Sequence, residues 1–493
     1  MADQVYILAL DIGTSSTRAL LYDASGSSVP GMSSQLTYQV TTSQAGEVSV
    51  DAEMLLELVV RTIDTVLQQA GERAQQIVAI ATSAFWHTLV PLSASGQPLM
   101  PLLTWEDTRP QQAATELRAL LDEPAIHQRT GARLHTSYWP AKIRWLQSTY
   151  PDIARQTARY VSFAEYLYER CLGRAICSIS MASGTGLFVL HTRNWDTELL
   201  NLLQLGPANF SPLGDVKDTL QGLTPEFATR WPALKHVPWL PAIGDGAAAN
   251  IGSNCSRLDT WAVTIGTSSA IRVVVPPEQV TPEQGLWLYA VDGRRALLGG
   301  ALSEGGNVLA WLRQILQTPG QAELEQQLER LAPAAHGLTI LPQLAGERSP
   351  GWHTQAHMTI AGLGLHTTQE EIIRAALEAV IFQLSRVYDQ LGQVLAVHVT
   401  RPRLIASGGA LLRSTLLSQI LADTLNVPLE LSDGGEASAR GVALLALEAS
   451  GMLPDLSQLP FKAATIVQHD PSRHAIYEEA RARQQALYRL LLD

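Results

Sequence analysis

The hydrophobic and polar positions of the chain follow two alternating rhythms, one typical of helices and one of short buried strands. Over residues 51–70 the aliphatic side chains share one face at the 3.6-residue spacing of a helix, and Asp51 can cap its start. The apolar run that follows predicts a strand over 77–83. Later runs predict a helix over 371–391, a strand over 404–407 and a helix over 414–425. Strands that alternate with helices indicate an α/β fold.

One five-residue sequence, Ile-Gly-Thr-Ser-Ser, occurs twice, at 12–16 and at 265–269, with apolar runs on both sides of each copy. Each copy predicts a β-hairpin with a turn of small residues. Glycine lets a ligand approach the backbone, and successive N–H groups in such a turn suit phosphate oxygens. One copy alone fits a plain surface hairpin equally well, but two copies facing each other would hold a polyphosphate from both sides. The predicted phosphate contacts are Gly13, Thr14, Ser15, Gly266, Thr267 and Ser268.

The spacing of the two copies, half a chain apart, indicates a duplicated lobe. We predict two lobes, residues 1–254 and 255–493, with a cleft between them. No low-complexity linker separates them, so we expect them to pack directly.

Composition narrows the class of protein. The chain has 493 residues, of which 46% are hydrophobic and 16% charged, which is typical of a globular protein. The formal net charge is −11 and no run of Lys or Arg is present, so we expect neither a nucleic-acid nor a membrane partner. The three cysteines form no C-x-x-C pair, which favours a reducing compartment. No signal-peptide or membrane-span pattern is seen, and the expected location is cytoplasmic.

Two aspartates stand where phosphate chemistry would need them. Asp11 ends an apolar strand just before the first turn, where a carboxylate beside phosphates would require a cation such as Mg²⁺. Asp245 is surrounded by small residues just before the second turn, where it can orient an attacking hydroxyl and accept its proton. The alternative is structural, since Asp after a strand often caps a turn and Asp-Gly often forms one.

Three further motifs are candidates for ligand contacts. Gly408, Gly409 and Ala410 follow a strand and leave bare backbone for a flat group such as adenine, although a tight turn explains them equally well. Trp86 and His87 follow the strand over 77–83, where ligands of α/β sheets gather, but such a pair often belongs to the core. In an extended segment Trp105, Asp107 and Arg109 would share one side and could hold hydroxyls, or Asp107 and Arg109 could pair with each other. Neither a Walker A sequence nor a dinucleotide-binding glycine fingerprint is present.

Together and in this order, these motifs resemble the FGGY carbohydrate kinases, whose ATPase core is shared with actin and hexokinase. The resemblance covers nearly the whole chain. It implies two duplicated actin/hexokinase-like lobes, with ATP and Mg²⁺ as cofactors and a small sugar as substrate. It extends to the motifs at Tyr138–Lys142, Ala182–Phe188, Gly299–Ala301, Gly346–Pro350 and Glu436–Ala439.

The resemblance also assigns roles to individual residues. It implies that Asp245 is the catalytic base and that Asp11 lies on the magnesium side. Thr14, Arg18 and Thr267 match phosphate contacts. The other positions that match are Gly306, Gly409 and Arg413 for the nucleotide, and Trp86, His87 and Tyr138 for the sugar.

The substrate is less defined than the reaction. Many relatives read Gln-Met-His where this chain reads Phe85-Trp86-His87, so the sugar pocket is reshaped. The runs over 267–272 and 104–107 look closest to gluconokinase-like members, which ranks gluconate first and a pentulose such as D-xylulose or D-ribulose second. Gluconate would need a cationic donor for its carboxylate. Arg109, Arg133 and His135 are candidates among which the sequence does not choose.

The sequence leaves two alternative functions open. An actin-like ATPase would use the same core without a sugar, and a pseudokinase would bind a sugar without transfer. The polar segment at 105–109 disfavours the first, and the presence of both Asp11 and Asp245 disfavours the second. A homodimer is compatible with the sequence, which indicates no interface.

Overall fold

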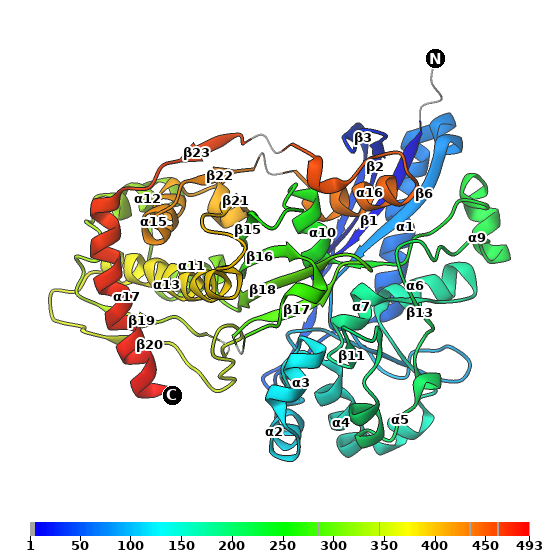
Figure 1. Ribbon diagram of the computed structural model, residues 1–493, viewed down its shortest axis with the longest axis horizontal. Coiled ribbons are helices and arrows are strands. Elements are labelled where there is room, and N and C mark those ends of the chain that lie inside the picture. The colour runs from blue at the N-terminus through cyan, green and yellow to red at the C-terminus, as the bar shows by residue number, and fades with distance from the viewer. Residues whose placement is uncertain (1–4, 284, 345, 433–434, 461–462, 493) are drawn as a thin grey trace.

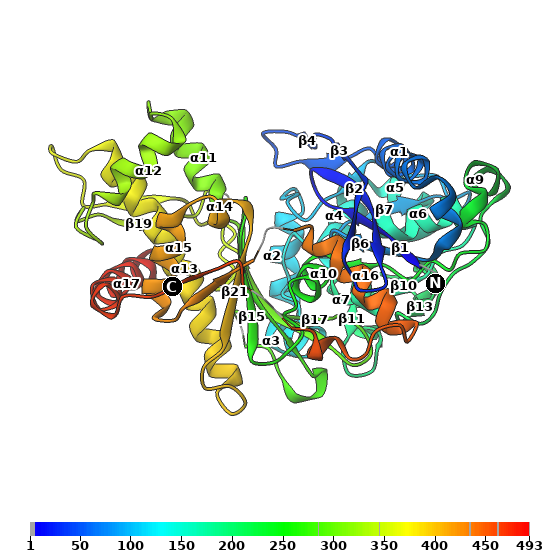
Figure 2. The same cartoon turned by 90° about the horizontal axis from the view of Figure 1, so that it is seen from above.

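The computed structural model describes residues 5–283, 285–344, 346–432, 435–460 and 463–492. Two lobes, each built around a mixed sheet, lie side by side (Figures 1 and 2). The predicted α/β class is therefore confirmed. No helix in the described part of the chain is long and apolar enough to cross a membrane.

The first sheet has the strand order β14-β6-β1-β2-β3. Its strands are β1 (Tyr6–Ile12), β2 (Ser16–Asp23), β3 (Ser28–Thr37), β6 (Ile77–Ala84) and β14 (Ile243–Gly244). β1 pairs antiparallel with β2 and parallel with β6, and β6 pairs parallel with β14. Every residue of β1 is buried, because helices cover both faces of the sheet at this point.

The second sheet repeats this plan within the order β17-β18-β16-β15-β21-β22-β23. β15 pairs antiparallel with β16 and parallel with β21, as β1 does with β2 and β6. Both predicted hairpins are thus confirmed, and the shared strand pattern supports the duplication. The strands are β15 (Thr260–Ile265), β16 (Ser269–Val275), β17 (Trp287–Ala290), β18 (Ala296–Leu302), β21 (Arg403–Ser407), β22 (Leu429–Leu431) and β23 (Thr465–Val467).

The remaining strands form small ribbons. They are β4 (Thr41–Thr42), β5 (Val48–Val50), β7 (Val90–Leu92), β8 (Leu102–Leu103), β9 (Arg159–Val161), β10 (Cys177–Ser178), β11 (Phe188–Val189), β12 (Asn194–Trp195), β13 (Leu213–Gly214), β19 (Thr339–Leu341) and β20 (Thr359–Ala361).

The helices agree with the periodicity of the sequence. Asp51 caps α1 by accepting a hydrogen bond from the Met54 N–H at 2.8 Å, and α13 and α15 occupy the segments predicted to be helical. The helices are α1 (Ala52–Ala70), α2 (Gln111–Leu120), α3 (Glu123–Thr130), α4 (Trp139–Thr149), α5 (Pro151–Gln156), α6 (Phe163–Leu172), α7 (Ile179–Ser183), α8 (Thr197–Leu202), α9 (Pro225–Arg230), α10 (Asp245–Gly252), α11 (Gly306–Ile315), α12 (Gln321–Glu329), α13 (Gln369–Leu395), α14 (Gly409–Leu412), α15 (Thr415–Leu425), α16 (Ala437–Ala449) and α17 (Pro471–Leu491).

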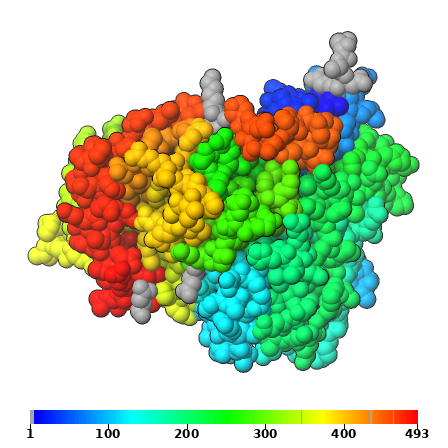
Figure 3. Space-filling model, in the orientation of Figure 1, coloured from blue at the N-terminus to red at the C-terminus, as the bar shows by residue number. Residues whose placement is uncertain are grey.

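The C-terminal segment does not stay within the second lobe. Helix α16 returns to the first lobe, where it packs on β1, β6 and α10, and its orange surface lies against the blue N-terminal strands (Figure 3). Glycines make the approach of α10 and α16 close: a Cβ on Gly252 would lie 1.8 Å from the Ala437 oxygen, and one on Gly441 would lie 1.8 Å from the Ala248 oxygen. This tight crossing holds α10, which begins at Asp245, in a fixed place beside the first sheet.

Candidate active site

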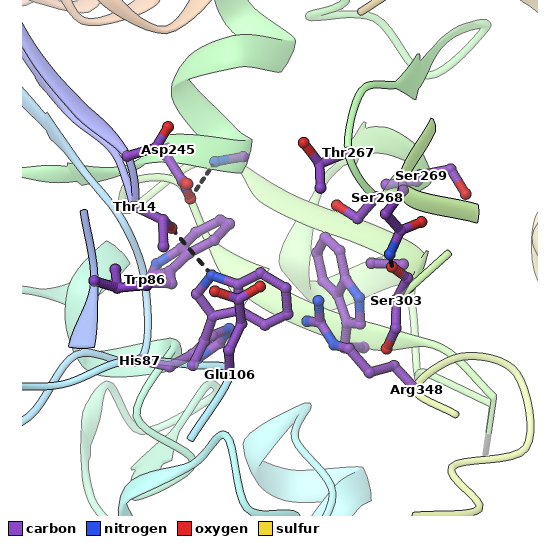
Figure 4. Close-up of a pocket in the computed structure, with 18 of the residues that line it drawn as sticks. Thr14, Trp86, His87, Glu106, Asp245, Thr267, Ser268, Ser269, Ser303 and Arg348 are labelled. Carbon is purple, nitrogen blue, oxygen red and sulfur yellow. Dashed lines mark hydrogen bonds between the residues drawn. The ribbon is translucent and has the colours of Figure 1, made fainter. Parts of the chain in front are cut away.

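A cavity of about 710 Å³ is lined by side chains from both lobes. Figure 4 shows Thr14, Trp86, His87 and Glu106 on one side and Thr267, Ser268 and Arg348 on the other. The two Gly-Thr-Ser turns therefore face one cavity. Of the residues predicted from sequence, those that line it are Thr14, Ser15, Trp86, His87, Trp105, Asp245, Thr267 and Ser268.

Asp245 opens helix α10 directly after strand β14, so its carboxylate sits at the helix N-terminus and at the edge of the cavity. The Gly246 N–H donates to its Oδ1 at 2.8 Å. Burial raises the pKa of Asp245 above the ordinary value of 3.8, while nearby Arg272 opposes that rise. A carboxylate that is held in place and made more basic than usual has the properties of a general base.

The indole of Trp86 packs beneath the backbone that carries Asp245. Its N–H donates to the Ser180 oxygen at 2.9 Å. The ring leaves no room for a side chain at the glycines on either side of Asp245. A Cβ on Gly244 would lie 1.8 Å from Trp86 Cε2, and one on Gly246 would lie 2.8 Å from its Cζ3. The sequence Gly-Asp-Gly is thus explained by close packing on an aromatic ring.

We expect Gly244→Ala to lower kcat/KM for the acceptor by more than about tenfold, because the methyl group must displace Trp86 and, with it, Asp245. Steady-state kinetics with a fixed saturating ATP concentration measure this. Gly392→Ala is the matched control, since nothing lies within 4 Å of its added Cβ. Equal activity of the two variants would contradict the packing argument.

Asp11 lies at the end of β1, buried beside the first turn. Arg18 Nη1 donates to Asp11 Oδ2 at 3.1 Å and also lies 3.1 Å from Glu436 Oε2. Burial raises the pKa of Asp11 from 3.8 to about 6; Arg18 lowers it, and Asp245 adds to the rise. Two like charges near each other in a buried place favour a cation between them.

The Asp11 carboxylate fits Mg²⁺, which uses one or two protein carboxylates and takes its other ligands from water and substrate phosphates. Among the described residues, no three His, Cys, Asp or Glu side chains gather closely enough to hold a metal by themselves. A metal at Asp11 would therefore depend on a bound phosphate.

A second cavity of about 690 Å³ lies in the C-terminal lobe between α11, α12 and α14. It shares Thr267 and Asn307 with the first cavity, so the two meet at the second turn. The Gly306 N–H donates to the Gly266 oxygen at 2.8 Å, and the Asn307 N–H to the Thr267 oxygen at 3.1 Å. The predicted nucleotide residues that line it are Gly266, Thr267, Gly306, Gly409, Ala410 and Arg413.

Neither cavity is lined by Asp11 or by Arg18, which pair with each other behind the first turn. Three further predicted residues also stand behind the cavities instead of lining them. Gly13 closes the first turn by donating to the Ser16 oxygen at 3.0 Å. Gly408 adopts a φ of 97°, and a Cβ there would lie 2.4 Å from the Ile265 oxygen. Tyr138 is buried, and its hydroxyl lies 2.5 Å from that of Tyr289. These residues shape the turns and the cavity wall.

Aromatic rings from both lobes pack together in and behind the wall of the first cavity. Trp287 and Tyr289 of β17 stack with ring centroids 4.5 Å apart, and Tyr289 meets Trp86 edge to face at 4.9 Å. His87 packs on Tyr138 at 5.0 Å, and its ring Nδ1 bonds the Gly184 oxygen. Flat apolar faces with a few polar atoms suit the C–H faces and hydroxyls of a sugar.

Two buried basic side chains near the aromatic rings, His87 and Lys142, have lowered pKa values, and Lys142 also donates a hydrogen bond to the backbone. Burial, with help from Arg348, lowers the pKa of His87 well below 6.5, so that its imidazole is uncharged at neutral pH. Burial also lowers the pKa of Lys142 to about 7; its Nζ donates to the His87 oxygen at 2.6 Å. His87 has a φ of 67°, a backbone conformation that this hydrogen bond helps to fix.

The extended arrangement predicted for residues 105–109 is wrong. Trp105 and Glu106 form a turn and line the cavity, whereas Asp107 and Arg109 point away from it. Asp107 is fully buried and pairs with Arg109 at 2.5 Å, and Arg109 also reaches Glu47 at 3.3 Å. The turn separates Trp105 from Asp107 and Arg109, and the ion pair between the last two is the alternative that the sequence left open.

The candidate donors for a substrate carboxylate are also placed elsewhere. Arg133 pairs with Glu123 at 2.9 Å, and burial lowers the pKa of His135 to about 3. The cations that line the cavity are instead Arg272 of β16 and Arg348. Both residues lie in motifs that the sequence analysis noted, but neither was predicted to line the cavity. Strand alternation after the second turn could have identified Arg272, whereas Arg348 reaches the cavity only through tertiary folding.

Comparisons with known proteins agree with this geometry. Residues 6–252 match the model for the FGGY family of carbohydrate kinases, N-terminal domain, and residues 261–450 match the model for its C-terminal domain. The gluconokinase of Bacillus subtilis (strain 168) is 28% identical over 94% of this chain and 92% of its own length.

Two solved structures from Lactobacillus acidophilus superpose on nearly the entire chain. One is described as a gluconate kinase and the other as a ligand-bound xylulose kinase. Each has a TM-score of 0.90 and 25% identity, and each comparison covers 99% of this chain and 98% of the other.

Proposed function

Because the chain belongs to the FGGY family of carbohydrate kinases, which use ATP, we propose that it phosphorylates a sugar acid, with D-gluconate as the favoured acceptor. Membership of this family supports the proposed reaction, which is transfer of the γ-phosphate of ATP to a sugar hydroxyl. The observation that carries the choice of an acid is the pair of guanidinium groups, Arg272 and Arg348, that line the cavity. The similarity to gluconokinases supports the same choice.

In this proposal the nucleotide occupies the second cavity, with adenine near Gly409 and Ala410 and the phosphates at the shared turn. The γ-phosphate then lies between Thr14 and Thr267, and the sugar fills the aromatic end of the first cavity. Asp245 orients the acceptor hydroxyl and takes its proton, while the surrounding rings exclude water. Mg²⁺ held by Asp11 and the phosphates would neutralise charge that develops during transfer.

A panel experiment tests the acceptor. ADP release is measured with ATP and Mg²⁺ in the presence of D-gluconate, D-xylulose, D-ribulose and glycerol. We expect strong stimulation by gluconate. Stimulation by a ketopentose alone would replace the acid by the second candidate, which the xylulose kinase structure supports. ATP hydrolysis that no sugar stimulates would favour an actin-like ATPase instead.

Thr267 provides a separate test of the nucleotide site. Its side chain is exposed in the second turn and borders both cavities. We expect Thr267→Val to raise KM for ATP about tenfold or more and to change KM for the sugar much less, because a hydroxyl donor to phosphate is lost. Thr65→Val on the exposed face of α1 is the control. An unchanged dependence on ATP would remove this turn from the nucleotide site.

A further inference from the structure

Arg272 is carried toward the cavity by the alternation of strand β16. Ala270 and Arg272 line the cavity, whereas Ile271 and Val273 point into the second core. Arg272 stands three residues along the strand from Ser269, so it lies about 10 Å beyond the second turn. The Cα of Arg272 therefore lies well beyond the turn residues, while its Nε approaches Gly246, the residue after Asp245.

The neighbouring strand leaves a channel for this side chain. Gly299 of β18 is paired with Arg272 and Trp287, and a Cβ on Gly299 would lie 3.1 Å from Arg272 Cγ and 3.0 Å from Trp287 Cη2. At the far end, a Cβ on Gly246 would lie 3.5 Å from Arg272 Nε. Glycines on both sides thus let an arginine lie beside Trp287 and reach the backbone next to Asp245.

Arg348 reaches the same cavity from the second lobe (Figure 4), with its guanidinium 4.9 Å from the centroid of the Trp105 ring. Its Nε is buried without a hydrogen-bond partner among the described residues. Neither Arg272 nor Arg348 forms an ion pair within the described part of the chain, in contrast to Arg109 and Arg133. Both guanidinium groups are half-buried, and the Asp245 carboxylate acts on Arg272 without forming an ion pair with it, so both groups can bind an anionic ligand in the cavity.

We propose that Arg272, with Arg348 as a second donor, binds the carboxylate of the acceptor and makes the cleft selective for sugar acids over neutral polyols. This inference rests on the proposed sugar-kinase function. Planar guanidinium groups hold a carboxylate through two parallel hydrogen bonds. Asp245 lies close enough to Arg272 to influence its pKa, so the guanidinium and the proposed base would act on the same bound acceptor.

The test compares D-gluconate with D-glucitol, which carries a hydroxymethyl group in place of the carboxylate. In Arg272→Gln we expect nucleotide-free binding of gluconate, measured by calorimetry, to weaken about 10- to 100-fold. The ratio of kcat/KM for gluconate to that for glucitol should fall by a similar factor. Arg272→Lys, which keeps the positive charge but loses the planar guanidinium that can make two parallel hydrogen bonds, should recover part of the loss. Arg257→Gln, at an exposed pair with Asp259, is the control.

Unchanged gluconate binding in Arg272→Gln would overturn the inference, as would an equal loss with both acceptors, which would assign Arg272 to the phosphoryl group. A wild-type enzyme that phosphorylates D-xylulose but neither binds nor phosphorylates gluconate would refute the acid substrate while leaving the kinase intact. Variants are compared only after their unfolding temperatures match that of the wild type, so that a folding defect is recognised as such.

Discussion

Asp245→Asn should lower kcat by about 10²- to 10⁴-fold while leaving the affinity for ATP nearly unchanged. The asparagine keeps the shape of the side chain and can still accept the Gly246 N–H bond, but it cannot take a proton. Burial raises the pKa of Asp245, which makes the carboxylate a stronger base than an exposed one. Substitution therefore removes proton transfer and little else.

Sugar phosphorylation and equilibrium binding of ATP are measured side by side for this variant. Asp259→Asn, which changes an exposed carboxylate that pairs with Arg257 and Thr260, serves as the control. A kcat within about tenfold of the wild type would refute the role of Asp245 as base, since positioned acid–base groups contribute more than that. A parallel loss of ATP binding would show that the substitution disturbs α10 and the nucleotide site together.

The architecture was accessible from the sequence because its signals are local. The helix capped by Asp51 and the two Gly-Thr-Ser hairpins are each determined by residues within one segment. The return of α16 to the first lobe was not predicted, because it depends on glycine contacts between Gly252 and Gly441, which lie far apart in the chain. Such long-range packing leaves no periodic pattern.

Site residues that depend on local signals were also predicted, whereas those that depend on tertiary folding were not. Residues in turns after strands, such as Thr14 and Thr267, face the cavity as predicted, because a turn fixes where its own side chains point. The prediction that Trp105, Asp107 and Arg109 share one side failed because a turn at 105–106 interrupts the extended backbone on which it depended, whereas the alternative of an Asp107–Arg109 pair is confirmed. Arg348 enters the cavity only through tertiary folding, so no local signal identified it.

The proposed Mg²⁺ requirement should depend on pH through Asp11, whose pKa is raised by burial to about 6. Below that pH the carboxylate is protonated and protons compete with the metal, so the apparent affinity for Mg²⁺ should fall about tenfold for each further pH unit. Titration of activity with Mg²⁺ at pH 8, 6 and 5, at saturating ATP and sugar, measures this. Asp11→Asn should lose about 10²- to 10³-fold in activity at pH 8 and should show a much weaker pH dependence.

The same pKa predicts a stability effect that needs no metal or substrate. Because the folded-state pKa of Asp11 lies above 3.8, ionisation is less favourable in the folded protein, and the resulting cost is fully present above pH 6 and absent below about pH 4. Replacing the carboxylate with a neutral amide should remove it, which corresponds to about 3 kcal/mol at pH 8. Metal-free Asp11→Asn should therefore unfold at a higher temperature than the wild type at pH 8, with a smaller difference at pH 5. A variant that is less stable at pH 8 would contradict the raised pKa, because it would mean that the ionised carboxylate, paired with Arg18, stabilises the fold.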